Sequence, residues 1–305
     1  MNSTNFSRTC DDFLQYGKVI KNFQPETIKG YRHFFKLFVK MTELENLEHL
    51  SSEMIERFLY DGRINRNWSA STFRTYLKRL RAFCNWCVKK KLIKRNFTDD
   101  IDKPPMERRL PECLTPDQCE TILETAYHLK YYFKIEGVRN RAVLAIMIFA
   151  GLRLSEVANL KRRDVDFETE TITIRQGKWN KDRQIPISSR LMYFLYEYVE
   201  AKNKRDSQHI HFFSSVKRDE PIQTRGIQLL CRKIRDRSGV KFSPHMLRHT
   251  FATLTYRGSR DIYAVSGLLG HSSVETTKIY THLSLDDQRK SVESHVMNNL
   301  SKAEY

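Results

Sequence analysis

A break in the hydrophobic pattern between Asn96 and Pro111 divides the chain into two parts. Pro104 and Pro105 lie inside it, and adjacent prolines favour an extended connection because each fixes its own φ and disfavours helix in the preceding residue. The segment Thr115-Pro116-Asp117-Gln118 then has the signals of a helix start, with an N-cap Thr, a first-turn Pro and a Gln that completes a capping box. The sequence therefore predicts two domains, residues 1–96 and 113–305, joined by a linker over residues 97–112.

The first part is predicted to be entirely helical. Apolar residues at helical spacing, clearest from Phe73 to Cys87, form one core-facing stripe. The lone C-x-x-C of Cys84 and Cys87 falls on this stripe, which favours core packing over a redox or zinc role, since no second pair follows at zinc-finger spacing. We expect helices over residues 10–20, 25–42, 52–59 and 71–90.

The net charge of +17 indicates a polyanionic partner. Residues 1–106 contribute +8 and residues 107–305 contribute +9, so both domains are basic and nucleic acid is the expected ligand of both. Arg74, Lys78 and Arg81 lie on one helix face and are candidate DNA contacts, although such a face is more often simply solvated. No apolar run reaches the ~20 residues of a membrane span. Without a membrane anchor or a disulfide framework, a cytoplasmic, nucleoid-associated protein is expected.

The second part is predicted to combine helices with one short antiparallel sheet. Residues 165–176 alternate in the manner of a strand, a turn follows over residues 177–182, and residues 183–187 return as the second strand of a hairpin. Helices are expected from residue 116 onward and over residues 139–150, 188–202, 224–238, 245–257, 261–269 and 273–282.

Four short patterns of the second part contain the groups that phosphodiester chemistry needs. They are Gly151-Leu152-Arg153-Leu154-Ser155-Glu156, Gly177-Lys178, His245-Met246-Leu247-Arg248-His249, and Leu269-Gly270-His271 followed by Tyr280. The transition state gathers charge on the non-bridging oxygens, which two guanidiniums, such as Arg153 and Arg248, can clamp bidentately. A phenol of pKa ~10 needs activation before it attacks, and Lys178 can protonate the leaving oxygen.

In this order and spacing, the set resembles the tyrosine recombinase, or phage integrase, family, which includes Xer recombinases. The resemblance is densest from about residue 150 to residue 282, and the two-domain layout extends it to most of the chain. It implies a mainly α fold: an N-terminal helical, SAM-like DNA-binding domain and a mostly helical catalytic domain with a small antiparallel sheet. Together the domains would form a C-shaped clamp around the duplex.

The resemblance also implies a mechanism. Tyr280 would be the nucleophile, forming a 3′-phosphotyrosine with neither metal nor ATP. Arg153 and Arg248 would hold the phosphate, and Lys178 would be the general acid. His245 would assist proton transfer at the tyrosine, and His271 would bond the phosphate. Support would come from Glu156 and His249. Apart from the resemblance, Lys181 and Arg183 are further candidate DNA contacts. The partners would be double-stranded DNA and three more copies of the chain, as a tetramer on two synapsed sites, with accessory proteins left open.

Some alternatives remain. The biological task is expected to be integration or excision of a mobile element, with Xer-type dimer resolution as the alternative. Trp179 stands where relatives often have Gly after the lysine, which leaves Lys181 as a second candidate acid. His245 and His249 have the spacing of zinc ligands, but Met246 replaces the glutamate of H-E-x-x-H. A catalytically silent DNA-binding protein fits the charge equally well but not the complete set of six residues.

Overall fold

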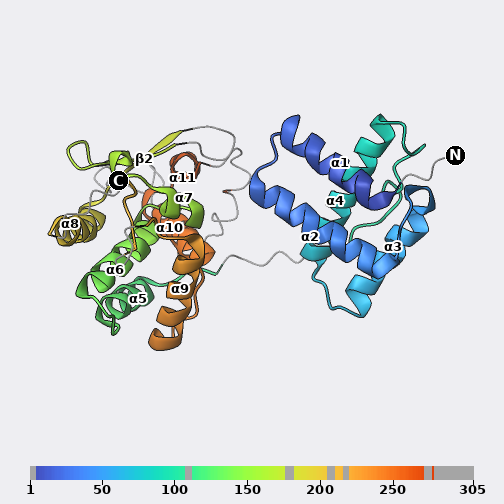
Figure 1. Cartoon of the computed structure of the whole chain (residues 1–305). Helices are drawn as coiled ribbons and strands as arrows, with labels where there is room; N and C mark the ends of the chain where they lie inside the picture. The colour runs from blue at the N-terminus through green and yellow to red at the C-terminus, as the bar shows by residue number, and fades with distance from the viewer. Residues whose placement is uncertain are drawn as a thin grey trace, which may run out of the picture. The chain divides into compact units, whose positions relative to one another are not determined.

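The computed structural model describes residues 5–106, 112–175, 182–204, 210–215, 220–270 and residue 277. Contacts divide the chain into two compact units, Met1–Arg109 and Leu110–Tyr305, so the division falls inside the segment predicted as a linker. The predicted fold class is confirmed, because both units are mainly helical and a small antiparallel sheet lies in the second one (Figure 1). No helix among the described residues has the length and apolar character needed to cross a bilayer.

Four helices around an aromatic core make up the N-terminal unit. They are α1 (Phe6–Val19), α2 (Pro25–Thr42), α3 (Ser52–Ile64) and α4 (Ala70–Lys89), with a 3-10 turn, η1, at Leu47–His49. The rings of Phe6, Phe13, Phe35 and Phe83 meet mostly edge to face, the geometry that aromatic quadrupoles favour. Cys84 and Cys87 are fully buried in this core, and Ile101, within the predicted linker, packs there too.

Helices also dominate the second unit, where α6 forms its centre. Eight helices are described: α5 (Pro116–His128), α6 (Lys134–Phe149), α7 (Leu154–Asn159), α8 (Ser189–Asn203), α9 (Thr224–Ser238), α10 (Pro244–Ser259), α11 (Ile262–Leu269) and the 3-10 turn η2 (Arg162–Asp164). Helix α6 is buried along nearly its whole length because it packs against α5, α8 and α10. The capping box predicted at Thr115 and Gln118 is present at the start of α5.

The sheet has three strands rather than the predicted two. Strands β1 (Val165–Asp166), β2 (Thr171–Ile174) and β3 (Arg183–Pro186) pair antiparallel in that order, with Ile172 opposite Ile185 and Ile174 opposite Arg183. The expected single strand over residues 165–176 is interrupted because the Asp166 carboxylate accepts the backbone N–H groups of Glu168 and Thr169, and Glu170 adopts φ 51°. These features make a tight turn between β1 and β2.

Candidate active site

The junction between α6 and α7 places Arg153. Helix α6 ends at Phe149 with Ala150 as its C-cap, and Gly151 takes a left-handed conformation with φ 63°. A Cβ at Gly151 would lie 2.2 Å from Cδ1 of Phe251, so only glycine fits both the backbone and the space. Arg153 is then the N-cap of α7, and its side chain keeps 29% of its surface exposed. The turn thus fixes the backbone of an arginine whose head remains accessible.

Arg248 comes from α10 and is buried, with 5% of its side chain exposed. Its Nη1 donates to the Gly151 carbonyl at 2.6 Å and its Nη2 to the Leu269 carbonyl at 2.5 Å. These bonds connect α10 to the turn before Arg153 and to the last residue of α11. Helix α10 itself is well defined at its start, since the Ser243 side chain caps Met246 and Pro244 is in the first turn.

Glu156 is the acid around which the arginines gather. Its carboxylate accepts the backbone N–H of Arg153 at 2.7 Å and the Nη1 of the same residue at 2.8 Å. It lies 4.0 Å from Nη1 of Arg248. Burial alone would raise the pKa of Glu156, but hydrogen bonds and charge from Arg183 and Arg153 outweigh it and bring the pKa to about 2. Glu156 is therefore ionised throughout the physiological range and holds Arg153 in place.

Arg183 does not have the exposed position expected of a DNA contact. Only 8% of its side chain is exposed, and it donates to both Glu156 oxygens, at 2.9 and 2.7 Å, and to the Leu268 carbonyl at 2.9 Å. The prediction overlooked strand alternation, which puts Arg183 on the same face as buried Ile185. That signal was available in the sequence.

The C-terminal end of α11 accepts from all three arginines. The carbonyls of Leu268, Leu269 and Gly270 take hydrogen bonds from Arg183, Arg248 and Arg153 respectively, the last at 3.4 Å. Unpaired carbonyls at a helix end carry partial negative charge, so cations are favoured there. Gly270, the middle residue of the L-G-H pattern, has φ 60°. No sequence motif predicts that these carbonyls accept hydrogen bonds from arginines.

His245 and His249 lie on the same face of α10 as Arg248. Their rings are 4.2 Å apart at 69°. Burial, followed by the charges of Arg248 and Arg153, lowers the pKa of His245, and burial with the neighbouring His245 and Arg248 lowers the pKa of His249 to about 4. Both imidazoles are therefore neutral at pH 7. His245 is exposed, and His249 is half-buried.

The other predicted site residues are only partly covered by the structure. Lys178, Lys181, His271 and Tyr280 lie outside the described residues, as does the helix predicted over 273–282. In the described part of the chain, no cluster of His, Cys, Asp and Glu side chains is arranged to hold a metal ion. Arg153, Glu156, Arg183, His245 and Arg248 come from three separate segments, α7, β3 and α10.

In the N-terminal unit, two of the three candidate DNA-binding residues have partners within the protein. Arg74 Nε donates to the Pro104 carbonyl at 2.9 Å. Arg81 donates through Nη2 to the Thr98 carbonyl at 2.8 Å and through Nε to Thr98 Oγ1 at 3.3 Å. Lys78 is exposed. Arg74 and Arg81 thus attach the segment after α4 to the helix, and Lys78 is the exposed member of the face.

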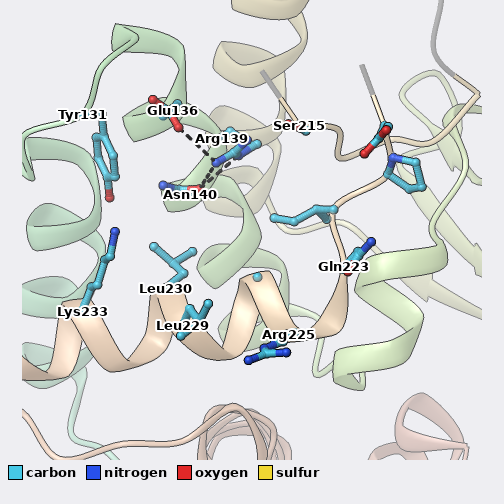
Figure 2. A pocket seen from close by; sticks show the side chains of 14 residues that line it. Tyr131, Glu136, Arg139, Asn140, Ser215, Gln223, Arg225, Leu229, Leu230 and Lys233 are labelled. Atoms are coloured by element: carbon cyan, nitrogen blue, oxygen red, sulfur yellow. Dashed lines mark hydrogen bonds and ion pairs between the residues drawn. The ribbon is translucent and has the colours of Figure 1, made fainter. Parts of the chain in front are cut away.

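A pocket elsewhere on the second unit contains none of the predicted residues. It lies between the start of α6 and α9 (Figure 2). Arg139, which lines this pocket, donates through Nε and Nη2 to Asn140 Oδ1 at 3.0 and 2.9 Å. Its Nη2 lies 3.9 Å from Oε1 of Glu136. Internal partners therefore hold this guanidinium in place.

Comparison with known proteins finds relatives over nearly the whole chain. The sequence profile of the phage integrase family matches residues 112–286, and that of the phage integrase N-terminal SAM-like domain matches residues 10–94. The chain is 28% identical to the tyrosine recombinase XerC of Bacillus pumilus (strain SAFR-032) over 96% of its own length and 97% of that protein. It is 31% identical to the tyrosine recombinase XerA of Thermococcus onnurineus (strain NA1), with coverages of 88% and 89%.

A solved structure shows the same fold. The Tn1549 transposon integrase in complex with circular intermediate DNA superposes with a TM-score of 0.74 at 18% identity, over 95% of this chain and 100% of that one. The catalytic-domain profile alone spans more than half of the chain, and the XerA relative exceeds 30% identity over most of it. The chain therefore belongs to the phage integrase family of tyrosine recombinases, the enzymes that cleave and rejoin DNA strands in site-specific recombination.

Proposed function

We propose that this protein recombines two DNA sites through a covalent 3′-phosphotyrosine formed by Tyr280. The observation that supports this most strongly is the pair of arginines, Arg153 and Arg248, which are oriented by one carboxylate and by backbone carbonyls. Two preorganised guanidiniums stabilise charge that develops on the non-bridging oxygens of a phosphodiester. Such preorganisation lowers the barrier because little rearrangement is needed as the charge appears.

The remaining residues complete an in-line displacement. The phenolic oxygen of Tyr280 bonds to phosphorus as the bond to the 5′ oxygen breaks, and Lys178 donates a proton to that leaving oxygen. His245, neutral at pH 7 and exposed, accepts the proton of the phenol. His271 adds a hydrogen bond to the phosphate, and His249 supports His245. Attack by the 5′-hydroxyl of a partner strand reverses the step and releases Tyr280, so no external energy source is consumed.

The partners that follow from this chemistry are duplex DNA and further copies of the chain. Strand exchange between two duplexes requires a nucleophile at each of four strands, which four protomers on two synapsed sites supply. The net charge of +17, distributed over both parts of the chain, supports a protein that contacts the duplex with both units. The Tn1549 integrase, which has this fold, was solved in complex with circular intermediate DNA.

For the biological role, we propose Xer-type resolution of dimeric circular DNA. The support is that the named XerC and XerA relatives align over nearly their entire length, whereas the likeness to the transposon integrase is one of fold. Integration or excision of a mobile element is the alternative that the sequence favoured. The two roles predict different DNA: one fixed site on a replicon for Xer-type resolution, or the two ends of a mobile element.

The test is covalent capture. The protein is incubated with a library of nicked duplexes from its source genome and denatured, and DNA bound to protein is isolated and sequenced. Wild type is expected to form an adduct that Tyr280→Phe abolishes, while Tyr263→Phe, which alters an exposed tyrosine of α11, retains it. An adduct that persists in Tyr280→Phe would refute the assigned nucleophile. Tight duplex binding by wild type with no adduct on any DNA would refute the proposed reaction.

A further inference from the structure

Arg183 connects the parts of the active site that come from different segments of the chain. It is the first residue of β3, the strand that follows Lys178 in the sequence. Its guanidinium binds Glu156, which in turn holds Arg153, and the Leu268 carbonyl at the end of α11, just before His271. One side chain therefore joins the strand that follows Lys178 in the sequence, the carboxylate that holds Arg153, and the helix that precedes Tyr280 in the sequence.

We propose that Arg183 is a positioning residue for strand cleavage, which acts through Glu156 and the end of α11 rather than through contact with DNA. This inference rests on the proposed function. The pairing of the two side chains supports it, because Nε, Nη1 and Nη2 of Arg183 all donate to protein acceptors and both Nη bonds go to the ionised Glu156 carboxylate. The pair is also nearly buried, with 8% of the Arg183 side chain and 10% of the Glu156 side chain exposed.

The contacts explain why this position requires arginine. Two parallel bonds to the Glu156 carboxylate, at 2.9 and 2.7 Å, use the two Nη atoms, and Nε points to the Leu268 carbonyl. A planar guanidinium presents these donors in one fixed fork, whereas an ammonium is a point charge on a flexible chain. Lysine would retain the positive charge beside Glu156 but could not hold the carboxylate and α11 in one geometry.

Loss of this geometry affects the chemical step more than binding. Without the fork, the Glu156 carboxylate can rotate, and the Arg153 guanidinium that it holds moves with it. A displacement of about 1 Å in a catalytic group can cost on the order of 100-fold in rate. Contacts between the rest of the protein and DNA are unaffected, so affinity is expected to stay nearly the same.

The test compares Arg183→Lys with Arg141→Lys in the full-length protein on the nicked duplex captured by wild type. Arg141 is a matched control, because its side chain is also 8% exposed and is paired with Glu197 and Glu124, away from the candidate site. Thermal unfolding, duplex affinity, and the amplitude and rate constant of single-turnover adduct formation are measured. Reduced stability alone lowers the amplitude, whereas mispositioning lowers the rate constant of the folded fraction.

For Arg183→Lys we expect affinity within a few-fold of wild type and a rate constant about 100-fold lower, while Arg141→Lys keeps the wild-type rate constant. Glu156→Asp is a second variant, which leaves Arg183 intact but shortens the side chain that accepts its hydrogen bonds. It should also lower the rate constant while the affinity stays near that of wild type. The rate constant of the double variant should fall by a smaller factor than the product of the factors found for the two single variants. A wild-type rate constant in Arg183→Lys, or an equal loss in Arg141→Lys, would overturn the inference, whereas a missing wild-type adduct would instead refute the proposed function.

Discussion

A single carboxylate, that of Glu156, holds the charged side chains of the catalytic unit together. Glu156 is nearly buried, yet its pKa is about 2, because Arg183 and Arg153 offset the cost of removing the carboxylate from water. In the described structure, each of these arginines also binds a carbonyl at the end of α11. Removing one charge would leave the others buried without compensation, so this cluster is expected to be sensitive to single substitutions.

Glu156→Gln should destabilise the second unit in a pH-dependent way. The depressed pKa means that stabilisation is fully present above the ordinary value of 4.5 and is lost as the pH falls through about 2. The shift corresponds to about 3 kcal/mol in the free energy of unfolding at pH 7. Urea denaturation should show this difference at pH 7 and a smaller one at pH 3. Glu120→Gln, in an exposed ion pair with Arg190, is the control and should cost less than about 1 kcal/mol. A difference that does not change between the two pH values would contradict the assignment.

The residues of the candidate site are positioned by the ends of several helices. Arg153 follows the end of α6, and Arg248 lies on α10. The carbonyls that orient them belong to the C-terminal end of α11 and to the Gly151 turn. Left-handed glycines at 151 and 270 let the chain turn sharply and bring these groups together. The two glycines are thus part of the geometry of the site as well as of the helix termination.

Gly151→Ala tests that role against Gly239→Ala. Both glycines have positive φ, 63° and 73°, but an added Cβ would meet Phe251 at 2.2 Å at position 151 and nothing within 4 Å at position 239. The left-handed backbone alone costs about 1 kcal/mol for alanine. Thermal unfolding should therefore show about 1 kcal/mol of destabilisation for Gly239→Ala and about 2–4 kcal/mol for Gly151→Ala, since overpacking adds about 1–3 kcal/mol. Only Gly151→Ala should also slow adduct formation. Equal destabilisation by the two variants would show that the Phe251 ring can move aside without a loss of stability.

The sequence predicted most helices because their signals are local. The capping box of α5 and the Ser-Pro start of α10 are short motifs that the chain satisfies by itself. The third strand was missed because its turn depends on the Asp166 side chain, and the role of Arg183 was missed because its partners are 27 and 85 positions away in the chain. The family motifs identified Arg153 and Arg248, but no motif indicates which backbone carbonyls orient them.

Across the whole chain, the positive charge is shared between side chains that bind the protein itself and side chains that are exposed and available to DNA. The chain has a net charge of +17, with +8 in residues 1–106 and +9 in the remainder. Arg81 and Arg183 add to this total, although their guanidiniums bind Thr98 and Glu156 within the protein. Exposed lysines such as Lys78 are better placed to replace the counterions of the duplex.

Duplex binding should therefore depend steeply on salt, and one residue should change the slope. If the chain neutralises about eight phosphates, the logarithm of the association constant falls with the logarithm of salt with a slope of about −7, or about 10⁴-fold between 50 and 200 mM. Lys78→Ala should reduce the magnitude of this slope by about one unit, because it removes one phosphate contact. Arg81→Ala should leave the slope unchanged and lower the stability of the N-terminal unit instead, because its donors bind Thr98. Fluorescence anisotropy with a labelled duplex measures the slopes, and thermal unfolding measures the stability. Reversal of the two results would mean that Arg81 exchanges its bonds to Thr98 for the DNA backbone.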